Sequence, residues 1–163
     1  VVDGTPYLAL ANYYDGNAYN INSKIFKWDV LGTTFVEYQS IATSGAHDWE
    51  AFVVDGTPYL ALANFRDGSP QVTGINSKIF KWDVLGTSFV ESQSIATTGA
   101  THWEAFIVDG IPYLAVANSE ASGVAPAQHN IDSKIFKWDS LGDSFVEFQS
   151  IPTRAASDWE AFV

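Results

Sequence analysis

The sequence repeats itself, and this repetition limits the possible folds more than any other feature. Residues 49–64 (WEAFVVDGTPYLALAN) have one full copy and two shortened copies elsewhere in the chain, at 103–118, 1–12 and 159–163. Residues 77–95 form a second repeated segment, with copies at 23–41 and 133–151. A period of about 52 to 56 residues predicts an array of similar units that bury their cores against one another.

Each unit contains four segments with the composition of β-strands. In the second unit these segments are residues 49–54, 59–64, 77–83 and 89–95. The Asp55-Gly56 dipeptide between the first two predicts a tight hairpin turn. The apolar run at 59–64 lacks polar alternation, as expected of a strand that is covered on both faces.

The predicted fold is therefore all-β, with three four-stranded antiparallel repeats that form blades of a β-propeller. We expect a single repeat array over residues 1–163. Its repeats cover about 1–48, 49–102 and 103–158, and residues 159–163 form an extra first strand. The Phe and Trp residues that alternate in the third segment of each repeat are expected in the core: Phe26, Trp28, Phe80, Trp82, Phe136 and Trp138.

Composition excludes several classes of function. Without cysteine the chain has no disulfide, no thiol nucleophile and no Cys-based zinc site. A net charge of −11 repels phosphate backbones, so nucleic acid is not an expected partner. No run of 18 apolar residues is present, and no membrane span is expected.

The repeats differ in length in one place only, the loop between the second and third segments. This loop separates Asn12 from Ser23 in the first repeat and becomes longer in each later repeat. Insertions in a repeat array usually gather on one face, often the binding face. Tyr and Asn suit adaptable recognition of protein or glycan surfaces. We therefore predict a binding face on these loops, formed by Tyr13, Tyr14, Asp15, Asn17, Tyr19, Asn20, Arg66, Asp67 and His129.

A glutamate follows the tryptophan at the start of each unit. Carboxylates that converge around a central channel would bind a hard cation such as calcium. The candidate ligands are Glu50, Glu104, Glu160, Asp48 and Asp158. In the alternative interpretation, each glutamate accepts hydrogen bonds from neighbouring backbone or hydroxyl groups. His102 replaces the aspartate in one repeat, which weakens a symmetric ring of Asp ligands.

Lysine and glutamate also recur at fixed spacing. Lys27 precedes Glu37 across a short hairpin, and Lys81 with Glu91 and Lys137 with Glu147 repeat the pattern. We expect these residues to form cross-strand ion pairs.

The motifs taken together resemble a known repeat. Ile-Phe-Lys-Trp-Asp, then Phe-Val-Glu-x-Gln-Ser-Ile, Asp-Trp-Glu-Ala-Phe and Asp-Gly-x-Pro-Tyr-Leu-Ala-x-Ala-Asn are similar to the epitempin (EPTP) repeat, also called the epilepsy-associated repeat (EAR). The resemblance covers the whole chain. It implies a β-propeller whose known members are mostly extracellular and bind other proteins, with no shared catalytic residues. Family domains usually carry seven repeats, whereas this chain has three.

Three blades are too few to close a propeller ring. We expect that the assembly strand (Trp159, Glu160, Ala161, Phe162 and Val163) completes the first blade of another copy. Reciprocal exchange would give a six-bladed ring with C2 symmetry, and open exchange would give a filament. In the alternative, a longer chain supplies the remaining blades.

The expected function is that of an extracellular, non-enzymatic module, secreted or at the cell surface, that binds proteins through the loop face. Self-association through the terminal strands would make it a homo-oligomer, or a structural or adhesive polymer. The alternatives are a calcium-assisted lectin and a glycan-acting enzyme. Ser44, His47 and Asp48 could be drawn as a catalytic triad, but no G-x-S-x-G motif is present and the repeats do not reproduce His47.

Overall fold

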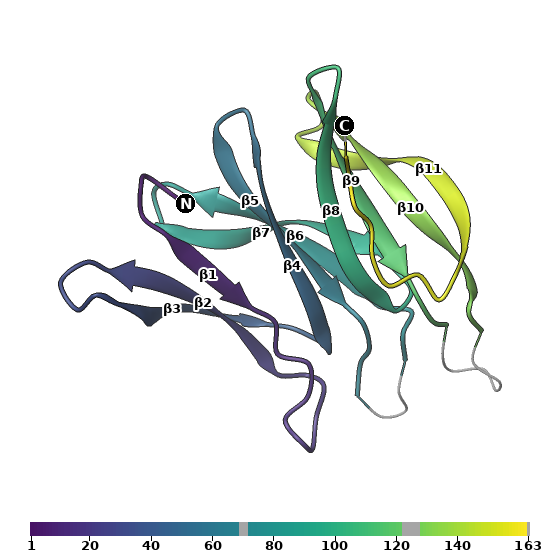
Figure 1. The fold of residues 1–163 in the computed structure, drawn as a ribbon, viewed down its shortest axis with the longest axis horizontal. Helices are drawn as coiled ribbons and strands as arrows, with labels where there is room; N and C mark the ends of the chain where they lie inside the picture. Colours follow the sequence, from purple (N-terminus) through teal and green to yellow (C-terminus); the bar gives the residue numbers. More distant parts are fainter. Residues whose placement is uncertain (69–71, 122–127, 163) are drawn as a thin grey trace.

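The computed structural model describes residues 1–68, 72–121 and 128–162. Three antiparallel sheets stand side by side like the ribs of a fan (Figure 1). Blade 1 has the strand order β1-β2-β3, blade 2 has β4-β5-β6-β7, and blade 3 has β8-β9-β10-β11. The strands are β1 Tyr7–Leu10, β2 Asn22–Asp29, β3 Thr34–Ala42, β4 Ala46–Val54, β5 Thr57–Asn64, β6 Asn76–Asp83, β7 Ser88–Ala96, β8 Ala100–Val108, β9 Ile111–Asn118, β10 Asn130–Asp139 and β11 Ser144–Arg154.

The predicted all-β, antiparallel fold is confirmed, and the described residues contain no helix. The ring is not closed by these three blades. In the hairpin between β4 and β5, Asp55 and Gly56 have φ angles of 47° and 79°. Two successive positive φ angles match the twist of the flanking strands, which explains the Asp-Gly dipeptide at this turn. Strand β4 begins three residues earlier than expected, at Ala46, and so includes His47 and Asp48.

The core lies between adjacent blades. All residues of β5 from Tyr59 to Asn64 are buried, and β9 shows the same pattern. Trp103 of β8 is fully buried between blades 2 and 3. The predicted aromatic core is confirmed at Phe80, Trp82 and Phe136. Burial of each large ring contributes about 2 kcal/mol or more to folding.

Blade 1 is the exception, because it has only three strands and no blade before it. Leu8 and Leu10 of β1 are 53% and 48% exposed. Their counterparts in β5, Leu60 and Leu62, are 6% and 0% exposed. Trp28 is also only partly buried. The difference in exposed fraction between these leucines corresponds to the surface that a further strand and blade would cover.

The expected Lys–Glu pairs form with a different lysine. Glu37 pairs with Lys24 at 2.7 Å, and Glu91 and Glu147 pair in the same way with Lys78 and Lys134. The register that starts at the turn between β2 and β3 places Glu37 opposite Phe26, whereas Lys27 lies opposite Val36. Because side chains alternate between the faces of a strand, Lys27 and Glu37 lie on opposite faces. The predicted pairs of Lys27, Lys81 and Lys137 with these glutamates are therefore wrong.

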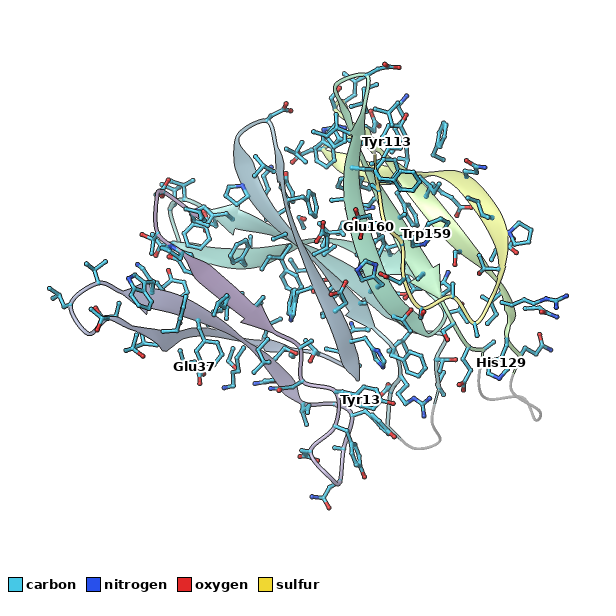
Figure 2. The ribbon with its side chains drawn as sticks, in the orientation of Figure 1. Tyr13, Glu37, Tyr113, His129, Trp159 and Glu160 are labelled. Carbon is cyan, nitrogen blue, oxygen red and sulfur yellow. The ribbon has the colours of Figure 1, made fainter. Side chains whose placement is uncertain are left out.

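Within one chain, the described residues of the expected assembly strand do not form a β-strand. Residues 158–162 run as an extended thread beside β8, where Trp159 and Glu160 are labelled in Figure 2. Trp159 is partly buried, whereas Phe162 is 91% exposed. Val163, the last residue of the expected strand, lies outside the described residues.

Candidate binding face on the variable loops

The loops after β1, β5 and β9 emerge on the same side as the links that follow β3, β7 and β11 (Figure 1). We call this side the loop face. Backbone hydrogen bonds join each loop to the link of its own blade: the amide of Gly45 donates to Tyr19, that of Gly99 to Thr73, and that of Ala155 to His129. Each link thus fixes the position of the loop beside it.

A repeated side-chain network holds both ends of each loop. In blade 2, the Asn64 amide group accepts from the Ser44 backbone amide and donates to the Asn76 carbonyl. The Asn64 backbone amide donates to the hydroxyl of Ser77, which is fully buried and 2.9 Å from the Thr97 hydroxyl. Buried polar groups must be paired. This network explains why Asn, Ser and Thr recur at these positions while the loop between them varies.

Aromatic side chains from the first two loops gather on the loop face. The Tyr13 ring lies 5.2 Å from Tyr19 and 4.8 Å from His47, and His47 lies 4.7 Å from Phe65. The Tyr14 and Tyr19 rings are 4.7 Å apart. Edge-to-face and tilted contacts at such distances stabilise ring clusters. Tyr13 and Tyr14 remain 37% and 46% exposed, so the cluster presents rings to solvent.

Arg66 completes this group, which we call the aromatic–arginine cluster (Tyr13, Tyr14, Tyr19, His47, Phe65 and Arg66). Its guanidinium lies 4.6 Å from the centre of the Phe65 ring and 5.5 Å from that of Tyr19, within cation–π range. Its Nη2 atom lies 3.8 Å from a Glu120 carboxylate oxygen of blade 3. Tyr13, His47, Phe65 and Arg66 line an open hollow of about 430 Å³. The cluster therefore connects all three repeats.

The neighbouring rings and charges change the pKa of His47. His47 is exposed at the surface, but its packing against neighbouring rings removes water and lowers the pKa of His47 below the usual 6.5. The Arg66 cation lowers the pKa further, whereas Asp48 acts in the opposite direction. Neutral imidazole can donate and accept hydrogen bonds at the same time.

The other predicted binding residues have distinct roles. The Asp15 carboxylate accepts from the backbone amides of Asn17 and Ala18, and these bonds lower the pKa of Asp15 below its usual value. Asn20 donates to the Asp67 carboxylate and so links the first loop to the second. These contacts shape the first two loops, where Asp15, Asn17 and Asn20 are exposed beside the rings.

His129 lies apart from the cluster, at the end of the third loop (Figure 2). Two members of the cluster, His47 and Phe65, were not among the predicted binding residues, and neither was Glu120. Phe65 directly follows the repeated Asn64, at the position that Tyr13 holds in the first repeat. An aromatic residue after this Asn in two successive repeats is the signal that could have identified it.

The repeated glutamates accept hydrogen bonds from the next unit. The Ala105 amide of blade 3 donates to Glu50 of blade 2 over 3.2 Å, and the Ala161 amide donates to Glu104 over 3.1 Å. Burial raises the pKa of Glu50 above its usual value, and the Glu104 charge adds to this effect, whereas the hydrogen bond from Ala105 opposes it. These contacts agree with the alternative interpretation, in which each glutamate accepts hydrogen bonds and does not serve as a ligand of a cation.

The aspartates before the tryptophans act in the same way. The Trp103 amide donates to Asp48 over 2.9 Å. One unit further on, the Trp159 amide donates to His102, which stands at the position of Asp48 in its repeat. Asp158 contacts the same His102 nitrogen at 3.0 Å. Among the described residues, no three His, Asp or Glu side chains form a group that could hold a metal ion. Calcium binding by Glu50, Glu104, Glu160, Asp48 and Asp158 stays a prediction.

The molecule has one three-stranded and two four-stranded antiparallel sheets that pack face to face. The chain enters each following sheet through its first strand, and this arrangement defines an array of β-propeller blades. The EPTP domain model matches residues 34–83 and 88–139. The chain therefore belongs to the EPTP domain family.

Longer proteins contain similar repeats. The human thrombospondin-type laminin G domain and EAR repeat-containing protein is 42% identical over 141 residues, which cover 86% of this chain and 20% of that protein. Human leucine-rich repeat LGI family member 2 is 25% identical over 133 residues, or 80% of this chain and 21% of that protein. The chain spans about a fifth of the length of these curated relatives. No helix in the described parts of the chain is long and apolar enough to cross a membrane.

Proposed function

We propose that this chain is an extracellular, non-enzymatic module that binds other proteins through its loop face. The observation that carries the proposal is the aromatic–arginine cluster. Tyr and Arg are the residues that most often anchor protein interfaces, because they combine large contact area with directed polar groups. The family resemblance supports the extracellular setting. The names of the relatives describe their repeats and domains.

The form of the loop face favours a macromolecular partner. The hollow lined by Tyr13 and Arg66 is open, and the neighbouring Tyr14 ring lies at the surface. Small ligands usually bind in enclosed clefts that cover most of their surface. An exposed group of rings beside an arginine suits a protein surface with apolar side chains.

The second part of the proposal is self-association through the terminal strands. The free edge of β1 and the thread at 158–162 support this part. Copies that join in this way form a closed C2 ring or a filament, and in the second case the protein is a structural or adhesive polymer. Sedimentation at increasing protein concentration tests it, because a chain that stays monomeric throughout would contradict self-association.

The loop face can be tested with a panel of immobilised extracellular proteins. We expect the chain to bind at least one member, and Tyr14→Ala to weaken that binding by about tenfold or more, as at an interface anchor. Leu85→Ser is the matched control, because Leu85 is 97% exposed in the β6–β7 turn. A partner that responds to Leu85→Ser but not to Tyr14→Ala would show that the proposed face is wrong.

A glycan array distinguishes the lectin alternative. With the proposed function, the chain gives no calcium-dependent sugar signal above that of a chelator-treated sample. Strong glycan binding that disappears with chelator would replace the protein-binding proposal with that of a calcium-assisted lectin. Calorimetric titration with calcium alone would test the predicted carboxylate ligands directly.

A further inference from the structure

Blade 2 holds blade 3 through two kinds of contact that depend on repeated residues. Asp48 and Glu50 accept from the Trp103 and Ala105 amides, as described above. The Gln93 side chain donates to the Phe145 carbonyl over 2.7 Å and accepts from the Phe145 amide over 2.9 Å. Gln39 of blade 1 makes the same pair of bonds with Phe89 of blade 2.

The outer side of blade 3 carries the same groups. Gln149 occupies the position of Gln39 and Gln93, but it is exposed whereas they are partly buried. Phe148 occupies the position of Tyr38, whose ring lies 6.4 Å from Trp82 of the next blade. Phe148 itself is 58% exposed. The outer side of blade 3 thus carries side chains equivalent to those through which blades 1 and 2 contact the blade that follows them.

Blade 1 presents the complementary half. Within the described residues, β1 pairs only with β2, so its second edge is free. Between β1 and β4 lies a hollow of about 250 Å³, lined by Leu8, Ala9, Trp49, Ala51 and ten further residues. In blades 2 and 3 the first strand, with the sequence Trp-Glu-Ala-Phe, pairs with the equivalent of β1. The thread at 159–162 has this same sequence and no strand partner among the described residues of its own chain.

We propose that residues 159–162 of one copy form the missing first strand of blade 1 in a second copy. This inference rests on the proposed self-association and specifies its geometry. The register follows from blade 2, where Trp49 pairs with Leu62, Ala51 with Leu60 and Phe52 with Tyr59. The corresponding pairs between copies are Trp159 with Leu10, Ala161 with Leu8 and Phe162 with Tyr7.

The same correspondence assigns the polar contacts of this interface. Asp158 and Glu160 of the donor accept from the Trp49 and Ala51 amides of the acceptor, as Asp48 and Glu50 accept from blade 3. Gln149 of the donor pairs with the backbone of Phe35, the counterpart of Phe89 and Phe145. The acceptor copy is thus held by backbone pairing along β1, by the two carboxylates and by the glutamine.

The absence of cysteine makes this register directly testable. Leu8→Cys and Ala161→Cys are prepared as separate single variants, both at exposed positions. Directly opposed residues of antiparallel strands lie within disulfide range. We expect a covalent dimer after mild oxidation of the mixture and little from either variant alone. Ala9→Cys mixed with Ala161→Cys is the matched control, because Ala9 is one residue out of register and points to the opposite face.

The possible results separate this inference from the broader proposal. Cross-linking of the Leu8–Ala161 mixture at least tenfold above the Ala9 control supports the stated register. A chain that assembles by sedimentation but shows no such preference overturns the register and leaves self-association in place. A monomeric chain overturns both. Neither result affects the loop face, which has its own test.

Discussion

At the scale of single residues, the glutamate after each first-strand tryptophan connects one blade to the next. Glu50 accepts the Ala105 amide, and its partly buried position raises its pKa. The carboxylate thus stabilises the fold as a hydrogen-bond acceptor, whereas the burial of its negative charge destabilises the fold. A neutral side chain with the same oxygen would keep the first property and lose the second.

Glu50→Gln should therefore alter the pH dependence of stability. The folded-state pKa of Glu50 lies above its usual 4.5, so the folded protein holds the proton more tightly between these two values. The free energy of unfolding contributed by this group is highest at low pH and falls as pH rises through that window. In chemical denaturation from about pH 4 to 7, the free energy of unfolding of Glu50→Gln relative to the wild type should rise with pH. A variant with an unchanged slope would contradict this assignment.

His47→Phe should have an effect of the opposite sign. The folded-state pKa of His47 lies below 6.5, so the unfolded chain binds the proton more readily. Stability contributed by neutral His47 is present above pH 6.5 and is lost as pH falls through the lowered value. Phe keeps the ring contacts with Tyr13 and Phe65, and the loss of stability on acidification should become smaller. His129→Phe, away from the cluster, is the control, and an equal effect there would contradict the prediction.

At the scale of elements, the links between blades have stricter requirements than the hairpin turns. Gly99 has a φ of 58°, and a Cβ atom there would lie 2.6 Å from the Glu120 carbonyl oxygen. Gly56 has a φ of 79° but open space around it. Both positions require a left-handed backbone, and only the first also requires close approach of another loop.

Gly99→Ala should therefore destabilise the protein more than Gly56→Ala. The left-handed conformation alone costs an alanine about 1 to 2 kcal/mol, which is the expected loss at Gly56. At Gly99 the link or the loop at Glu120 must also move, which adds to this cost and disturbs the loop face. Thermal denaturation of both variants measures the difference. Equal losses would show that the close approach is not restrictive.

At the scale of the whole molecule, the glutamine that recurs in each repeat has two different roles. Gln93 joins two blades of one chain through two hydrogen bonds, whereas Gln149 stands exposed on the outer side of blade 3. The first contact belongs to the folded chain. In the proposed assembly, the second belongs to the contact between copies.

Gln93→Ala should lower the free energy of unfolding by about 1 kcal/mol for each hydrogen bond lost, at any protein concentration. Gln149→Ala should leave the folding of a separate chain unchanged and weaken the assembly. Denaturation measures the first effect and sedimentation over a concentration series the second. Concentration-independent destabilisation by Gln149→Ala would argue against its place between copies.

The sequence by itself determined the repeated architecture. Residues 49–64 and their copies predict the strands, the Asp55-Gly56 turn and the covered strand β5, because strand period, turn chemistry and burial are properties of neighbouring residues. The prediction of variable loops on one face also follows from sequence, since the Asn64 and Ser77 positions that hold each loop repeat while the loop does not.

Only the tertiary structure decided which side chains meet. The register of the β2–β3 hairpin places Glu37 on the same face as Lys24 rather than Lys27, and spacing along the chain does not reveal that register. Likewise, His47 meets Phe65 through the packing of a link against a loop. Contacts within a strand follow from its period, whereas contacts between loops and blades depend on register and on the approach of distant segments, which no local pattern encodes.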